Sequence, residues 1–256
     1  YENNTTEDGD TVIRTDTFEI VIPAGQNFVE FDIKSINDDV YEKGENYTIT
    51  IDSITETIFE DLQKSDIDSV TTTIYDNGTE IPNGPEVPDD DRPTVSIAAV
   101  DGEAIEGVDN TLTFKVSQDN KSEFDTTADV KLNLGTVEVA DITSISYTDV
   151  NGDVQTITDI QAFVDGGSEL TVEIPKGDND APIITITVVD DTVYERSESL
   201  TLSVEDATNA DVSTTNDEAT GVILDETKPG NPDEPKEGDR PTVSIAAVDG
   251  EAIEGV

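Results

Sequence analysis

An internal repeat constrains the fold of this chain more than any other feature of its sequence. Residues 91–108 read DRPTVSIAAVDGEAIEGV, and residues 239–256 repeat the same eighteen letters 148 positions later. That spacing is the size of one domain, which predicts a tandem array of similar domains. A diverged match joins the N-terminal part to the middle through three short motifs: IPAG and IPKG at 22–25 and 174–177, VYE at 40–42 and 193–195, and IYD and ILD at 74–76 and 223–225.

The repeats set the expected domain limits. Residues 1–79 are predicted to be the C-terminal half of one repeat, 92–226 a complete repeat, and 240–256 the first strand of the next. The segments between them, 80–91 and 227–239, are rich in Pro, Asp and Gly, which is typical of stiff linkers. Because the chain begins with Tyr1 and no signal peptide opens it, we expect a fragment whose targeting signal lies elsewhere.

The complete repeat has the hydrophobic pattern of β-strands. Apolar residues occupy every second position in LTFKV at 112–116 and in LTLSV at 200–204. An Asn-Gly hairpin turn is expected at 150–153, and a single helical turn at 158–164, ending near Gly166. So many short strands predict an all-β fold of antiparallel sandwiches. The candidate strands are 94–99, 111–117, 128–134, 143–147, 155–157, 169–174, 183–189, 200–205 and 219–224.

The charge balance excludes several classes of partner and site. The chain carries 60 Asp and Glu against 13 Lys and Arg, a net charge of −47, so it lacks the basic surface that nucleic acids or anionic membranes require. Without Cys or His, disulfides, thiol nucleophiles and zinc sites are not expected. No apolar run is long enough for a membrane span. High net charge also fits disorder, but the alternating Val, Ile and Thr runs argue against it.

Acidic residues recur in groups at the predicted strand ends. Bare carboxylates repel one another, whereas calcium binds six to eight oxygen ligands and would hold them together. A solvated acidic surface without bound ions is the alternative interpretation. The groups in the complete repeat and its preceding linker are Glu103 and Glu106; Asp190, Asp191, Glu195 and Glu198; Asp225 and Glu226; and Asp89, Asp90 and Asp91. Those in the partial repeat are Asn37, Asp38, Asp39, Glu42 and Glu45, followed by Asp76 and Asn77.

Catalysis is not expected from this composition. Paired carboxylates can hydrolyse glycosides, but such sites usually have aromatic platforms for the sugar. Here aromatic residues make up 5% of the chain, and Trp is absent. The chain has no His base, Cys nucleophile or phosphate-binding loop, so we expect a protein that is not an enzyme.

The ordered combination of TVSIAAV…EG, IPxG, DDxVYExxExLTL and ILDE resembles the Calx-beta domain. In particular, it resembles the extender repeats of large RTX adhesins, which Gram-negative bacteria export by type I secretion. This resemblance implies immunoglobulin-like (Calx-beta-type) sandwiches with Ca2+ at the domain end. The implied ligands in the complete repeat are Glu106, Asp190, Asp191, Val193 through its carbonyl, Glu195, Glu198, Asp225 and Glu226. Those in the partial repeat are Asn37, Asp38, Val40, Glu42, Glu45 and Asp76, where Asn37 replaces an Asp of the family pattern.

The resulting hypothesis is a calcium-stabilised stalk segment of a secreted adhesin at the bacterial cell surface, supporting adhesion or biofilm formation. Its partners would be the neighbouring repeats of the same chain, with no nucleic acid and no membrane insertion by this segment. Two alternatives stay open: a module that itself binds a glycan or a host protein, and a calcium-sensing regulatory domain of the Calx-beta type. The ligand of the adhesin's distal domain is not readable from this segment.

Overall fold

The computed structural model describes residues 16–42, 44–55, 62–76, 91–225, 241, 243–246 and 254. Contacts between Cα atoms divide the chain into two units, Tyr1–Asn37 and Asp38–Val256. Within the described ranges, no helix has the length and apolar character needed to cross a membrane.

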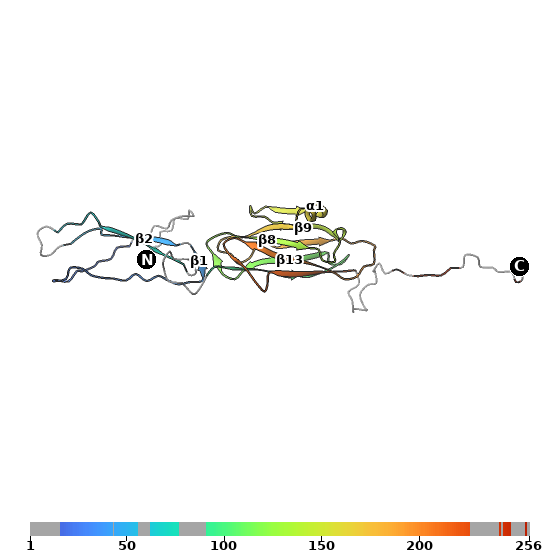
Figure 1. Ribbon diagram of the computed structural model, residues 1–256, viewed down its shortest axis with the longest axis horizontal. Helices are drawn as coiled ribbons and strands as arrows, with labels where there is room; N and C mark the ends of the chain where they lie inside the picture. The colour runs from blue at the N-terminus through green and yellow to red at the C-terminus, as the bar shows by residue number, and fades with distance from the viewer. Residues whose placement is uncertain are drawn as a thin grey trace. The chain divides into compact units, whose positions relative to one another are not determined.

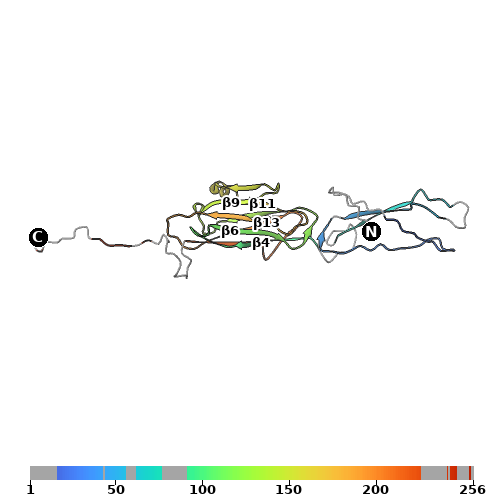
Figure 2. The same cartoon turned by 180° about the vertical axis from the view of Figure 1, so that it is seen from behind.

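The second unit contains a sandwich of two sheets, drawn in green to orange in Figures 1 and 2. One sheet has six strands in the order β10-β9-β12-β6-β4-β14, and the other has five in the order β11-β8-β13-β15-β5. The prediction of an all-β sandwich is confirmed. The strands of the two sheets are β4 (Thr94–Asp101), β5 (Glu103–Ile105), β6 (Thr111–Gln118), β8 (Thr126–Asn133), β9 (Ile142–Thr148), β10 (Val154–Ile157), β11 (Glu169–Ile174), β12 (Ile184–Val188), β13 (Glu198–Ala207), β14 (Asp211–Val212) and β15 (Glu218–Leu224). The short strand β7 (Lys121–Ser122) belongs to neither sheet.

The core lies between these two sheets and follows the alternation of the sequence. Leu112, Phe114 and Val116 on β6 are completely buried, while the residues between them are half-buried. On β13, Leu200 and Leu202 face the same core. Gly221 on β15 is required at this point, because a Cβ there would lie 2.9 Å from Leu112 Cδ1 and 3.0 Å from Phe114 Cζ. Packing this dense makes the core intolerant of added or removed volume.

The first strand of the sandwich changes sheets at Gly102. Before it, β4 pairs with β6 in the six-stranded sheet; after it, β5 runs parallel to β15 in the other sheet, with Ile105 opposite Leu224. A Cβ at Gly102 would lie only 3.2 Å from the Ala99 Cβ, so a residue without a side chain suits the crossing. Most strand pairs are antiparallel, as expected, but the crossing adds the parallel pair β5–β15, and β14 runs parallel to the start of β4. The crossing also brings Glu106 to the end of the last strand.

Two local elements of the sandwich can be compared with their predictions. Helix α1 (Ile160–Asp165) lies beside β9 (Figure 1), and its N-cap Asp159 accepts a hydrogen bond from the Ala162 N–H at 3.0 Å. The expected Asn-Gly hairpin turn lies between β9 and β10, within the loop 149–153. Only Gly152 of this loop has a positive φ, so the loop is not the two-residue type I′ turn, which needs two such residues. The Asp149 carboxylate organises this loop by accepting from the backbone N–H groups of Asn151 and Asp153.

The described part of the partial repeat is less regular. In the second unit, β2 (Glu45–Thr50) and β3 (Ser69–Ile74) form a hairpin, and β1 (Val40–Tyr41) pairs with β7. In the first unit, residues 16–37 contain a turn at Gly25 and an edge-on contact between the Phe18 and Phe31 rings, whose centroids are 5.5 Å apart. Both rings remain about half exposed.

Candidate metal centre

Acidic side chains from five segments of the sandwich meet at one of its ends. Glu106 follows β5, Asp141 ends the short 3-10 helix η1 (Val139–Asp141), Glu195 lies in the loop between β12 and β13, Glu198 begins β13, and Asp225 follows β15. We call these five residues, together with Asp191 of the loop between β12 and β13, the sandwich cluster.

Backbone hydrogen bonds fix the loops that carry the cluster. The Glu106 N–H donates to the Leu224 carbonyl at 3.0 Å, which holds the first strand against the last. The Glu195 N–H donates to Asp225 Oδ2 at 3.3 Å, and the Val193 N–H donates to Asp191 Oδ1 at 2.7 Å. These bonds leave the remaining carboxylate lone pairs available for a ligand, because each carboxylate has four acceptor positions.

Asp141 is held by a capping interaction of its own. Its Oδ2 accepts from the Glu138 N–H at 2.6 Å, and the Glu138 side chain accepts from the Asp141 backbone in return. The Asp141 carbonyl accepts from the Val189 N–H at 2.8 Å, which ties η1 to the end of β12. The carboxylate is therefore buried and positioned before any ion binds.

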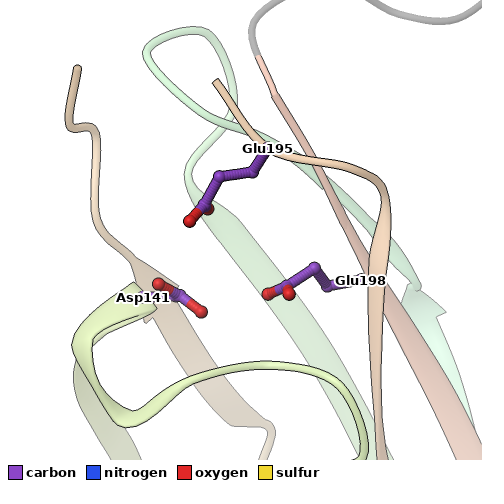
Figure 3. Close-up of side chains that lie close together, drawn as sticks. All are labelled: Asp141, Glu195 and Glu198. Atoms are coloured by element: carbon purple, nitrogen blue, oxygen red, sulfur yellow. The ribbon is translucent and has the colours of Figure 1, made fainter. Parts of the chain in front are cut away.

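Three of the carboxylates are close enough to share one ion. Asp141, Glu195 and Glu198 each place an oxygen within 4.8 Å of the others. Figure 3 shows the three side chains pointing toward one common space from η1, the loop and β13. Glu106, also nearly buried, interacts electrostatically with Glu195, Asp191 and Asp225.

The surroundings of the sandwich cluster disfavour the ionised form of its carboxylates. Burial, followed by the charges of Glu195, Asp191, Asp225 and Asp141, raises the pKa of Glu106 to about 7. Burial likewise raises the pKa of Glu198 to about 7, together with a hydrogen bond to Asp141 and the neighbouring charges. Burial, followed by the charges of neighbouring acids, raises the pKa of Glu195 as well. The ion pairs Lys64–Asp68, Arg92–Asp211 and Lys115–Asp180 lie elsewhere.

This donor set fits a hard divalent cation. The cluster offers carboxylate oxygens from several segments and no nitrogen or sulfur ligand, which favours calcium or magnesium over zinc or copper. A dication would reverse the repulsion that raises the pKa values and would stabilise the ionised carboxylates. Oxygens drawn from several loops suit calcium, which accepts irregular geometry and up to eight ligands, better than magnesium.

The structure brings together Glu106, Asp191, Glu195, Glu198 and Asp225 of the predicted ligands. Asp190 is exposed and contributes to none of the raised pKa values of the cluster. Val193 lies in the same loop with 54% of its surface exposed. Glu226 falls outside the described residues, as do Asp89 and Asp90 of the linker group. Asp91 is buried at the start of the sandwich, where its carbonyl accepts from Asn120 Nδ2 at 3.3 Å.

Sequence reasoning missed Asp141. It lies in the segment GTVEVAD, whose other acid is Glu138, and it is far from the other ligands in the chain. The available signal was its position directly before a strand of the alternating type, together with Glu138 three residues earlier in a capping arrangement. Glu138 also raises the pKa values of Glu195 and Glu198, so its carboxylate is close to both.

The partial repeat reproduces the loop geometry on a smaller scale. Asp38, Glu42, Glu45 and Asp76 form a second acidic group, which we call the hairpin cluster because it adjoins β2 and β3. The Val40 N–H donates to Asp38 Oδ1 at 3.1 Å, and the Glu42 N–H donates to Asp76 Oδ2 at 2.9 Å. These are the counterparts of the Asp191–Val193 and Glu195–Asp225 bonds. Asn37, the remaining predicted ligand, ends the first unit.

One acid from the complete sandwich acts on the hairpin cluster. Burial raises the pKa of Glu42, and the next largest cause is the charge of Glu123, ahead of Asp38, Glu45 and Asp76. Glu123 directly follows β7, and its N–H donates to the Tyr41 carbonyl at 2.9 Å. The hairpin cluster therefore lies where β1 meets the sandwich.

A family model and several solved structures match parts of this chain. The Calx-beta domain model matches residues 3–78 and 109–227. Among solved structures, the apo form of the Calx CBD1 domain is 14% identical over 51% of this chain and 96% of its own, with a TM-score of 0.36. The CBD12 region of CALX1.2 is 16% identical over 51% of this chain and 45% of its own, with a TM-score of 0.35.

A third solved structure comes from an adhesin. The collagen-binding domain from a Staphylococcus aureus adhesin is 10% identical over 52% of this chain and 97% of its own, with a TM-score of 0.23. This chain spans less than half the length of the CBD12 chain, and these scores are too low to transfer a ligand or a partner. No curated protein matches the chain. Because the family model matches well over half of the chain, in two separate stretches, the chain belongs to the Calx-beta domain family.

Proposed function

We propose that this chain is a calcium-stabilised structural segment, an extender in the stalk of a bacterial surface adhesin. The observation that carries the proposal is the duplication of one acidic loop arrangement within a single chain. Asp191, Val193, Glu195 and Asp225 make the same pair of hydrogen bonds as Asp38, Val40, Glu42 and Asp76. A site that recurs in each repeat fits a role in stabilising the repeats themselves better than the binding of one unique ligand.

Calcium explains the chemistry of the sandwich cluster. Asp141, Glu195 and Glu198 converge within 4.8 Å, and the raised pKa values report the cost of leaving such carboxylates without a cation. Extracellular calcium modules bind with dissociation constants of roughly 10⁻⁴ to 10⁻³ M. An ion that binds the folded state alone stabilises it by mass action. The segment would thus be weakly folded inside the cell and stable outside it, which suits export through a type I secretion machine.

The stalk role rests on the organisation of the chain. The identical segments 91–108 and 239–256 indicate recently duplicated repeats, and the linkers before them are rich in proline. A net charge of −47 resists collapse of one repeat onto another. A calcium-sensing domain would use the same cluster, and the Calx-beta family match is compatible with it. Repetition of the loops favours the extender, because a sensor needs no array.

Thermal unfolding of the whole chain tests the calcium dependence. With a dissociation constant of roughly 10⁻⁴ M, calcium at 10 mM would contribute about 2.7 kcal/mol for one site. That corresponds to a rise of about 10 °C in the midpoint of a domain of this size. We expect this rise in calcium, a much smaller one in magnesium and none in EDTA. Small-angle scattering in the same buffers should show a longer particle in calcium.

Two double variants supply the control. Asp141→Asn with Glu198→Gln should abolish the calcium-induced rise. Glu169→Gln with Glu205→Gln removes the same number of charges from exposed positions on β11 and β13 and should retain it. If calcium and EDTA give the same midpoint, or if both variants lose the response equally, the acidic groups are solvated surface and the proposal is wrong.

A further inference from the structure

The partial repeat is joined to the complete sandwich through a short strand pairing. Strand β1 runs parallel to β7, with Val40 opposite Lys121 and Tyr41 opposite Ser122. The Glu123 N–H donates to the Tyr41 carbonyl at 2.9 Å. The Tyr41 ring lies against Phe124, with ring centroids 5.5 Å apart. Backbone hydrogen bonds and an aromatic contact thus combine in one joint, as in other cases where a strand adds to an exposed edge.

The receiving segment, residues 121–124, is firmly built into the sandwich. Ser122 is 1% exposed, its Oγ accepts from the Phe124 N–H at 2.9 Å, and its carbonyl accepts from the Gly177 N–H at 2.9 Å. The next residue, Asp125, accepts from the Lys176 N–H at 2.9 Å. The segment keeps its shape through these internal contacts, so each complete repeat of this sequence carries the same receiving edge.

The complete repeat carries a second copy of the inserting motif. Val193, Tyr194 and Glu195 repeat the sequence of Val40, Tyr41 and Glu42. The hydrogen bonds that shape the two loops are equivalent. The exposure differs: Val40 and Tyr41 are half-buried in the joint, whereas 54% of Val193 and 49% of Tyr194 are exposed. A valine and a tyrosine are therefore presented at the sandwich end in a backbone shape that the other copy uses for docking.

The sequence also provides the spacing for a second joint. Fourteen residues lie between Asp76 and Asp91, where the complete repeat begins, and thirteen lie between Asp225 and Asp239, where its first eighteen residues recur. A following repeat would thus begin 45 positions after Tyr194 in the sequence, whereas the complete repeat begins 50 positions after Tyr41.

We propose that Val193 and Tyr194 form the docking edge for the following repeat, and that its occupant is that repeat's counterpart of residues 121–124. This inference deepens the proposed stalk function and rests on it, because it names the partner of each sandwich end. The joint would place the following repeat's counterpart of Glu123 beside Glu195, as Glu123 lies beside Glu42. A cation in each acidic cluster would offset this added repulsion.

Disulfide trapping tests the proposal directly, because the chain contains no cysteine. The full chain is extended after Val256 with a copy of residues 109–225, which completes a following repeat after 239–256. Paired residues on neighbouring strands have Cα atoms about 5 Å apart, a distance that a disulfide can span. The test pair is Val193→Cys with Lys121→Cys in the appended repeat. The reference pair is Val40→Cys with Lys121→Cys in the original repeat, and the control pair is Val193→Cys with Lys131→Cys in the appended repeat.

In calcium, we expect the test pair to oxidise at a rate close to the reference pair and at least tenfold faster than the control pair. Adding Tyr194→Ala to the test pair should slow its oxidation severalfold. The proposal is overturned if the test pair oxidises no faster than the control, or if the reference pair fails to form. A calcium-dependent rise in midpoint together with failed trapping would reject the joint and leave the proposed function standing. Trapping of the test pair without any calcium-dependent rise in midpoint would reject the proposed function and leave the joint standing.

Discussion

The complete sandwich and the partial repeat share sequence motifs but differ in how much of their apolar surface they bury. On β11, Leu170, Val172 and Ile174 are at most 2% exposed. Their sequence counterparts in the first unit, Phe18, Ile20 and Ile22, are 40% to 59% exposed. The acidic loops, in contrast, form the same hydrogen bonds in both repeats. Loop geometry is thus set by local sequence, whereas burial requires the opposing sheet.

Core truncation should separate the two regions most strongly. Phe114→Ala removes a completely buried ring from the sandwich and should cost about 3 to 5 kcal/mol of unfolding free energy. Phe31→Ala removes a ring that is 45% exposed and should cost less than about 1.5 kcal/mol, mainly through its contact with Phe18. Guanidinium unfolding followed by circular dichroism measures both. Equal losses would mean that the partial repeat has a core of its own.

Calcium affinity should distinguish the two acidic clusters next. The sandwich cluster has more converging carboxylates than the hairpin cluster, so we expect its calcium to bind about tenfold more tightly, or about 1.4 kcal/mol. Calorimetric titration of the full chain should show two classes of site. Asp141→Asn should remove the tighter class, and Glu42→Gln the weaker one. If Glu42→Gln weakened the tighter class instead, the assignment of the two classes would be reversed.

The pH dependence without calcium should be smaller, and its sign follows from the raised pKa values. Glu106 and Glu198 have pKa values of about 7 in the folded chain and an ordinary value of 4.5. Between these values the folded state binds more protons than the unfolded chain, so its stability falls as pH rises. In EDTA, we expect a midpoint a few degrees higher at pH 5 than at pH 7.5. Glu106→Gln with Glu198→Gln should flatten this dependence, and saturating calcium should oppose it. A midpoint that rises with pH in EDTA would contradict the electrostatic description of the sandwich cluster.

Surface ion pairs should give the smallest effects, and equal ones in the two regions. Lys64–Asp68 beside the hairpin and Lys115–Asp180 on the sandwich both join partly exposed side chains. Lys64→Ala and Lys115→Ala should each cost less than about 1 kcal/mol, because exposed pairs are screened. Hydrogen exchange of the neighbouring amides measures these local changes. A large loss at only one position would show that its lysine has a structural role beyond the pair.

Much of the fold was predictable because its strands are amphipathic. The alternation at 112–116 and 200–204 identified β6 and β13 directly, since one face of each strand is buried against the opposite sheet. β5, β7 and β14 were missed because each has only two or three residues, and a parallel neighbour defines it rather than its own periodicity. The hairpin at 149–153 was predictable from its Asn-Gly pair, whereas the hydrogen bonds that the Asp149 carboxylate accepts within this loop were not.

The site was predictable to the extent that its acids are adjacent in sequence. Asp191, Glu195 and Glu198 belong to one motif, and the end of β15 supplies Asp225. Asp141 could not be assigned from spacing, because its place in the cluster depends on η1 packing against the end of β12. Asp190 was included as the first acid of the Asp pair in the family pattern, and it is exposed in the structure.

The change of sheets at Gly102 has a mechanical consequence. Because β5 runs parallel to β15, a pull on the two ends of the repeat loads these strands in shear, along their length. The register pairs Glu103, Ala104 and Ile105 with Val222, Ile223 and Leu224, so the hydrogen bonds between them must give way together rather than one after another. Glu106 and Asp225 lie just beyond these pairs, so an ion held between them would cross-link the two strands at the end of the domain where the pulling force is applied.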